Sequence, residues 1–323
     1  MFNRYWRDYP WFMQAMQFAL MIFIFMGFSA VILGYVIPKI AGVSVEAVGT
    51  VTENSPMHII HGVLLMQFVG SFLMILVPAY LFAYNTHPEP GKYLGLVKPK
   101  GAQLLWVALL MLGIIPLLLT IPTWLHQINF GSSADKAQAD NDRLTNALLK
   151  MNNFGDFALT FATMAILPAI GEEMMFRGVL MKMAAKRSKG IVVPIVVSAI
   201  LFTWVHGNIY GMVSIFIAGS LLAVIYYITG SLWCSILAHM INNGLQIVTM
   251  YALKSDAQMK KAMTEADSVP WYYTVAGIVV FAFAFYMLWK KCTPLPKTWM
   301  NDFTNEELEA ITREETKNEE EQE

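Results

Sequence analysis

The chain has 323 residues, of which 56% are hydrophobic and only 14% are charged, and its mean hydropathy is +0.50. Soluble globular proteins are about half apolar and about a quarter charged, so this composition excludes an ordinary soluble domain and indicates a membrane protein. The formal net charge of −1 offers no basic surface for nucleic acid, and we expect no nucleic-acid partner.

Eight apolar runs follow one another, most of them close to the ~20 residues that a helix needs to cross a bilayer. We therefore expect an all-α, polytopic bundle of about eight transmembrane helices, with the lipid bilayer as a partner. The first run is too long for the core of a signal peptide and lacks a small-x-small cleavage pattern, so we expect it to remain in the mature protein. The runs are 11–37, 60–84, 102–125, 157–181, 191–206, 211–229, 231–250 and 271–289.

Lysine and arginine are distributed unequally between the two predicted sides of the membrane. If the N-terminus is cytoplasmic, the cytoplasmic segments hold 14 of these residues and the outer segments hold 7. Because cytoplasmic loops carry the excess of Lys and Arg, we expect both termini to be cytoplasmic and the protein to lie in the plasma membrane. Cys234 falls within a run and Cys292 just after another, so neither predicts a disulfide framework or a metal cluster.

The sequence predicts one transmembrane domain, residues 1–300, followed by an acidic tail, residues 301–323. The tail has no apolar periodicity, which predicts disorder. The first three runs are almost purely apolar and are expected to form a scaffold, whereas polar groups occur in nearly every run between Glu172 and Gln246.

The connection between the third and fourth runs, about 126–156, contains Leu144, Leu148 and Met151 at helical spacing. This pattern predicts a short interfacial helix, with a lid over a site as the alternative.

The segment GEEMMFRGVL, residues 171–180, carries three ionisable groups inside an apolar run. Each helical residue advances about 100°, so Glu173 and Arg177 lie about 40° apart and can pair. Glu172 lies roughly 140° from Arg177 and should face something else. An unpaired carboxylate in the membrane is costly unless it faces water, a metal or another polar group. The pattern predicts a structural ion pair and a separate Glu172, with one buried network of all three groups as the alternative.

Two later runs also carry polar groups. His206 lies near the end of the fifth run with Phe202 one turn below it, and a packed histidine is the alternative to a functional one there. The seventh run has a polar stripe, which should face the bundle interior or a water-filled cavity because lipid would leave its groups unsatisfied. Hydrogen bonding between helices for packing is the alternative. The stripe consists of Ser235, His239, Asn243 and Gln246.

A carboxylate, two imidazoles and a carboxamide on three runs are the groups that water activation requires, which predicts hydrolysis. Glu172 could take a proton from water, and Asn243 could donate a hydrogen bond to an oxyanion. The histidines could orient the water, bind a metal or protonate a leaving amine.

Glu172, His206 and His239 also satisfy the three-ligand pattern of catalytic zinc, although no HExxH motif is present. We expect no cofactor or one Zn²⁺ and favour the metal-free version. The reason is that few carboxylates remain to hold the second nitrogen of a zinc-bound histidine once Glu173 pairs with Arg177, with backbone carbonyl groups as the alternative partners.

Three motifs stand in order on successive runs: Glu172-Glu173-x-x-x-Arg177, Phe202-x-x-x-His206 and His239-x-x-x-Asn243. With them the chain resembles the CPBP intramembrane protease family, which includes type II CAAX prenyl endopeptidases, bacteriocin-processing proteins and lysostaphin resistance protein A-like proteins. The resemblance covers about residues 155–250.

The resemblance implies that Glu172 and His206 hold and activate the attacking water. His239 and Asn243 would stabilise the oxyanion, and Glu173 would support the first motif together with Arg177. The function expected is an intramembrane endopeptidase that acts on membrane-associated peptides or proteins. The alternatives are an ion- or proton-coupled transporter and a non-catalytic immunity or scaffold protein of the same family.

The predicted depths of the site residues conflict. Glu172 lies about 3 residues inward of the middle of its run and His206 about 6 residues outward of the middle of its own, a mismatch of roughly 13 Å. For one site to form, the fourth helix must shift or tilt, or the fifth must start deeper.

Overall fold

The computed structural model describes residues 5–253 and 269–295, together with Trp299, Glu309 and Arg313. Within this part of the chain every regular element is a helix, so the prediction of an all-α polytopic membrane bundle is confirmed. The tail, residues 301–323, was predicted to be disordered. Apart from Glu309 and Arg313, its residues lie outside the described ones.

Eight long helical segments correspond to the eight predicted runs within the described residues. Six are long and apolar enough to cross a membrane: Trp11–Ala41, Met57–Thr86, Gln103–Leu125 (α7), Phe154–Ala185, Met212–Thr229 (α13) and Trp271–Lys290 (α16). The other two are α12 (Val192–His206), which has only 15 residues, and α14 (Leu232–Ala252), which carries the polar stripe.

Three of the long segments contain π-helical stretches, in which hydrogen bonds run from i to i+5. The first comprises α1 (Trp11–Val31), η2 (Ile32–Val36) and α2 (Ile37–Ala41), and the second α4 (Met57–Ser71), η3 (Phe72–Leu76) and α5 (Val77–Thr86). The third comprises α9 (Phe154–Phe161), η4 (Ala162–Ile166), α10 (Leu167–Glu173), η5 (Met174–Leu180) and α11 (Met181–Ala185). Shorter elements are η1 (Trp6–Asp8), α3 (Glu46–Thr50) and α6 (Pro90–Tyr93).

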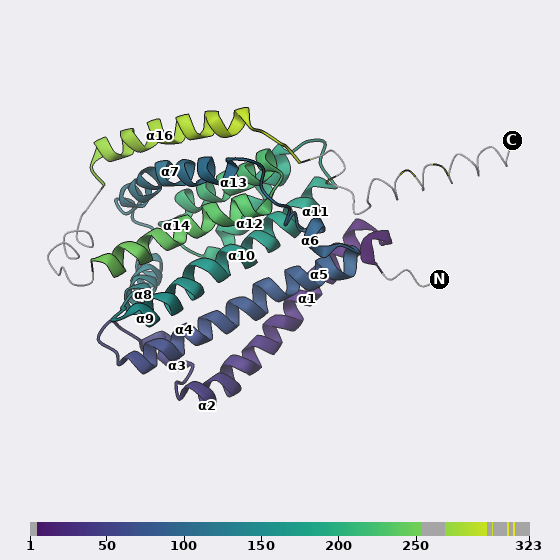
Figure 1. Cartoon of the computed structure of the whole chain (residues 1–323). Coiled ribbons are helices and arrows are strands. Elements are labelled where there is room, and N and C mark those ends of the chain that lie inside the picture. The colour runs from purple at the N-terminus through teal and green to yellow at the C-terminus, as the bar shows by residue number, and fades with distance from the viewer. Residues whose placement is uncertain (1–4, 254–268, 296–298, 300–308, 310–312, 314–323) are drawn as a thin grey trace.

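The helix with the first motif lies in the middle of the bundle (Figure 1). Helices α1, α4 and α5 cover one side of it, α12, α13 and α14 lie beside it, and α7 with α16 closes the other side. The start of α1 and the end of α16 lie at the same end of the bundle, as an even number of crossings requires.

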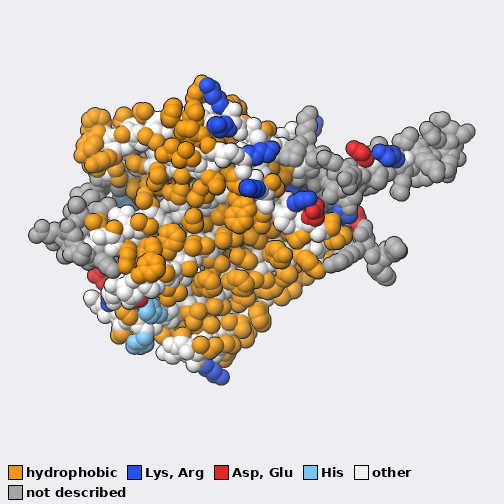
Figure 2. All heavy atoms as spheres, viewed as in Figure 1, with side chains coloured by type: hydrophobic (Ala, Val, Ile, Leu, Met, Phe, Trp, Pro, Cys, Tyr) orange, Lys and Arg blue, Asp and Glu red, His pale blue; other side chains and the backbone are white. Residues whose placement is uncertain are grey.

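The face of the bundle seen in Figure 2 is largely apolar. Only 11% of the most apolar window of the first span, and of α16, is buried inside the protein. Charged side chains lie mainly along the margins of the visible face (Figure 2). Lipid is the solvent that matches such a surface, because exposed apolar area of this extent is rare in soluble monomers.

The connection in which a short helix was predicted contains α8 (Ser132–Leu148), and Met151 lies beyond its end. Its Ala147 and Leu148 are buried, while most of its charged side chains are exposed. Hydrogen bonds join it to the rest of the protein: Arg143 Nη1 donates to the Val51 carbonyl oxygen at 2.6 Å, the Tyr210 hydroxyl donates to Asp135, and Thr160 Oγ1 donates to the Leu148 carbonyl oxygen at 3.3 Å. The helix is therefore part of the folded domain and not a free loop.

Helices α7 and α16 approach each other at two glycines. A Cβ atom on Gly277 would lie 2.4 Å from the Gly113 carbonyl oxygen, and one on Gly113 would lie 2.6 Å from the Phe281 nitrogen. Small residues permit this close backbone approach in membranes, where packing between helices is a principal driving force for association.

We expect Gly277→Val to lower the midpoint of thermal unfolding of the purified protein in detergent, because the side chain must push α16 away at a cost of about 1–3 kcal/mol. Gly27→Val is the matched control, since Gly27 also lies on a membrane helix but has no atom within 4 Å of its Cβ position. Equal midpoints for the two variants would contradict this packing.

Candidate active site

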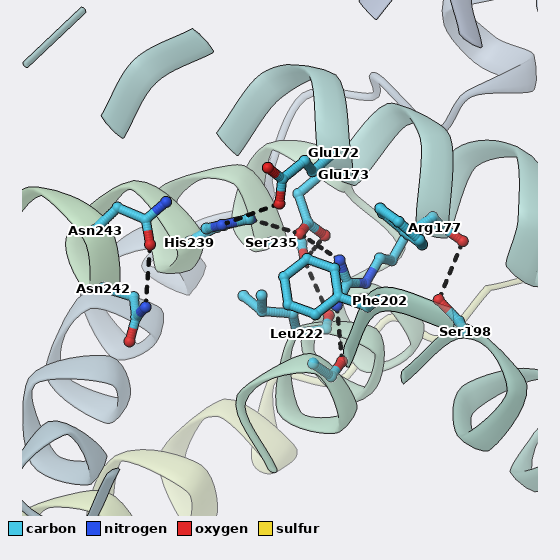
Figure 3. Close-up of polar contacts among 12 residues, drawn as sticks. Glu172, Glu173, Arg177, Ser198, Phe202, Leu222, Ser235, His239, Asn242 and Asn243 are labelled. Atoms are coloured by element: carbon cyan, nitrogen blue, oxygen red, sulfur yellow. Dashed lines mark hydrogen bonds and ion pairs between the residues drawn. The ribbon is translucent and has the colours of Figure 1, made fainter. Parts of the chain in front are cut away.

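The carboxylate of Glu173 is fully buried and accepts three hydrogen bonds (Figure 3). Its Oε1 atom accepts from Arg177 Nη1 at 2.6 Å and from His239 Nδ1 at 2.9 Å. Its Oε2 atom accepts from Ser235 Oγ at 2.6 Å. The predicted pairing of Glu173 with Arg177 is therefore present, and the same carboxylate also joins the motif helix to α14.

Arg177 extends the network to two more helices. Its Nη2 atom donates to the Gly219 carbonyl oxygen on α13 at 2.8 Å, and its guanidinium carbon lies 4.6 Å from the ring centre of Phe202 on α12. A Cβ atom on Gly219 would come within 3.1 Å of Phe202, so glycine leaves room for this contact. A charged side chain with no exposed surface is tolerated only when it is paired and hydrogen-bonded in this way.

Immediately after Glu173 the helix becomes π-helical over Met174–Leu180, whereas the sequence analysis assumed a continuous α-helix. Glu173 and Arg177 still lie on one face, as their contact shows. Ser198 Oγ donates to the Phe176 carbonyl oxygen at 3.1 Å within this stretch. Such π-helical turns are rare and occur frequently at functional sites.

Glu172 and the two histidines come together despite their predicted mismatch in depth. Glu172 Oε2 lies 3.9 Å from His206 Nε2 and 3.8 Å from His239 Nε2. The mismatch arose from treating the fourth and fifth runs as spans centred at one depth. Helix α12 is short and begins just after the connection that follows Ala185. The connection between Ala185 and Val192 joins the two helices at one end. Glu172 lies 13 residues before Ala185 and His206 lies 14 residues after Val192, so the two residues are about equally far from that end.

Both histidines are held with their Nε2 atoms towards Glu172. His206 Nδ1 lies 2.6 Å from the Phe202 carbonyl oxygen, and His239 Nδ1 contacts the Glu173 carboxylate. Carbonyl and carboxylate oxygens only accept hydrogen bonds, so each Nδ1 carries the hydrogen and each Nε2 of a neutral ring is an acceptor. Phe202 also contacts both imidazoles, with ring centres 4.4 Å from His206 and 5.7 Å from His239.

Three acceptor atoms therefore face one another. Glu172 Oε2 is buried and has no hydrogen-bond partner among the described residues, and the two Nε2 atoms lie within 4 Å of it. A buried acceptor without a partner is costly, so this arrangement calls for a donor or a cation between the three atoms. A water molecule fits when one of the two Nε2 atoms carries a proton, because it then accepts one hydrogen bond from that ring and donates its two hydrogens to the other two atoms.

Asn243 is not part of this cluster in the described structure. It lies one turn from His239 on α14 (Figure 3), and its Oδ1 atom accepts a hydrogen bond from Asn242 Nδ2 at 3.1 Å. It also lines a cavity between α7, α8, α13 and α14. The sequence did not indicate Asn242, and it could not indicate the carbonyl groups of Phe202 and Gly219, because any residue type supplies a carbonyl.

The carboxylate of Glu172 and the imidazoles of His206 and His239 are groups that commonly bind zinc, but the distances between their atoms do not match a zinc site. Ligands of a tetrahedral zinc, about 2.0–2.1 Å from the metal, lie about 3.4 Å from one another, and the distances here are 3.8 and 3.9 Å. Among the described residues no three His, Cys, Asp or Glu side chains are spaced to hold a metal ion. We derive no catalytic step through a metal.

One premise of the argument from sequence against zinc was wrong, namely that Glu173 would be used up by Arg177 and could not hold a histidine. Backbone carbonyl groups remained the alternative partners. Glu173 holds both Arg177 and His239, and the Phe202 carbonyl oxygen holds His206.

Comparison with known proteins matches residues 154–245 to the family model described as type II CAAX prenyl endopeptidase Rce1-like. No curated protein and no solved structure gives a significant match. The matched segment contains all three motifs and ends two residues after Asn243. Over residues 154–245, the resemblance to the CPBP intramembrane protease family is therefore confirmed.

Proposed function

We propose that the protein is an intramembrane endopeptidase that hydrolyses peptide bonds in membrane-associated peptides or proteins. The observation that carries this proposal is the convergence of Glu172 Oε2 and the Nε2 atoms of His206 and His239 around a space that requires a hydrogen-bond donor. The match to a prenyl endopeptidase family over this segment supports it.

In the proposed reaction Glu172 is the general base and His206 orients the water. Glu172 takes one proton while the water oxygen forms a bond to the scissile carbonyl carbon. The C–N bond then breaks, and the protonated Glu172 returns its proton to the departing amine. One water is consumed, and a carboxylic acid and an amine are released, which at neutral pH become a carboxylate and an ammonium group when the second water proton passes from one to the other.

His239 and Asn243 stabilise the oxyanion in this proposal. Because Glu173 holds His239 Nδ1–H, His239 can serve an oxyanion only when Nε2 also carries a proton, and the Glu173 carboxylate compensates the charge of that ring. The Nδ2 group of Asn243 supplies a second donor once substrate draws it towards His239.

We place the protein in the plasma membrane with both termini cytoplasmic, on the distribution of Lys and Arg. The common end of α1 and α16 supports two termini on one side.

Glu172→Gln should reduce cleavage of a panel of membrane peptides by the purified protein in lipid nanodiscs by about 10²–10⁴-fold, since a carboxamide cannot take up a proton. The midpoint of thermal unfolding should change little, because Glu172 Oε2 has no described partner. Glu53→Gln, at an exposed carboxylate, is the control. Retained turnover in a folded Glu172→Gln protein would remove the general base from this account. A folded wild-type protein that cleaves no peptide would favour the immunity or scaffold alternative.

Glu173→Gln should behave differently and lower the midpoint of thermal unfolding, because it leaves the buried Arg177 guanidinium without a counter-charge, at a cost on the order of 3 kcal/mol. The comparison with Glu172→Gln tests the division of roles between the adjacent glutamates. An unchanged midpoint with a full loss of activity would show that Glu173 acts in the chemistry and not in the framework.

Activity should survive removal of divalent metal by chelators, and elemental analysis of the purified protein should find no stoichiometric zinc. The reason is the spacing of Glu172 Oε2 from His206 Nε2 and His239 Nε2, which exceeds the roughly 3.4 Å of an ideal tetrahedral zinc site. Loss of cleavage on chelation, restored by zinc and abolished in His206→Ala, would establish the zinc version instead.

A further inference from the structure

A cavity of about 790 Å³ lies between α7, α8, α13 and α14. Its α14 wall contains Asn242, Asn243 and Gln246, one to two turns from His239, and its α8 wall contains Asp142 and Asn146. The α7 wall is apolar. The cavity therefore begins beside the candidate active site and extends towards the interfacial helix.

Polar groups of this cavity are available to a ligand. Within the described part of the chain, the side chains of Thr145, Asn146, Gln246 and Thr249 have no hydrogen-bond partner, and Gln246 is exposed on α14, which packs against the apolar helix α7. Such a group facing hydrocarbon would be unsatisfied, so it must face water or a polar ligand. Carboxamides and hydroxyls can donate to and accept from a peptide backbone, while the apolar wall can take side chains.

The charge of the cavity restricts the ligand further. No basic side chain occurs among the described residues that line it, and Asp142 places a carboxylate there. A free C-terminal carboxylate bound in this cavity would lose water without gaining a cation and would also face a like charge. An internal stretch of polypeptide has no such charge.

We propose that this cavity binds an internal, extended segment of the substrate, and that Asp142 disfavours substrates whose carboxyl terminus lies in it. This inference rests on the proposed endopeptidase function. It makes α8, which lies outside the segment matched to the family, a determinant of substrate choice.

The test compares peptides of one neutral sequence that differ only in a free or an amidated carboxyl terminus. Binding is measured on the inactive Glu172→Gln protein, so the result does not depend on turnover. Asn146→Cys provides an exposed reporter thiol, and Cys292→Ser removes the other partly exposed cysteine. The rate of maleimide labelling at position 146 then reports how far each peptide covers the cavity.

The amidated peptide should protect the thiol at about tenfold lower concentration than the acid, a difference that Asp142→Asn should reduce and Asp142→Lys should reverse. Asp140→Lys, on the same helix but outside the cavity lining, should leave the preference unchanged. Equal protection by both peptides, protection by neither, or the same shift with Asp140→Lys would overturn the proposal.

The same pair of peptides, incubated with the wild-type protein and followed for cleavage, separates this proposal from the proposed function. Protection without any cleavage would refute the endopeptidase and keep the cavity as a peptide site. If the rate of cleavage is the same for the acid and the amidated peptide, and is not changed by Asp142→Lys, only the cavity proposal is refuted.

Discussion

The arrangement of the motif helices depends on one buried carboxylate. Glu173 accepts hydrogen bonds from Arg177 on its own helix and from Ser235 and His239 on α14, and Arg177 reaches on to α12 and α13. Four helical segments are thus tied to one charged pair without exposed surface. Removing one partner would leave a buried charge uncompensated, so these helices cannot easily shift relative to one another. The fixed geometry orients His239 towards Glu172, and the chemistry we propose requires that orientation.

The adjacent glutamates illustrate how a membrane protein can separate framework from reactivity. Glu173 accepts hydrogen bonds from three donors, while Glu172 Oε2 has none among the described residues and faces two imidazole nitrogens. The contrast follows from helix geometry, because neighbouring residues point in directions about 100° apart. One side therefore meets α14 and the guanidinium, and the other meets the space between the two histidines.

Much of this was predictable from the sequence because hydrocarbon restricts the choices. Length and apolarity located the eight helices, and helical spacing predicted the contact of Glu173 with Arg177. The level of His206 was not predictable, since it depends on how short α12 is and where it begins. Nor were the π-helical stretch, the carbonyl groups of Phe202 and Gly219, or the cavity beside Asn243, because backbone groups and the spaces between helices leave no signature in residue type.

The most direct measurement is an experimental structure of the protein in a lipid nanodisc, at a resolution that shows ordered water. The account predicts one water within about 3 Å of Glu172 Oε2 and of both Nε2 atoms, with Glu173 contacting Arg177 and His239 at once. A structure in which His239 turns away from Glu173, or in which His206 and Glu172 lie on opposite sides of the motif helices, would contradict it.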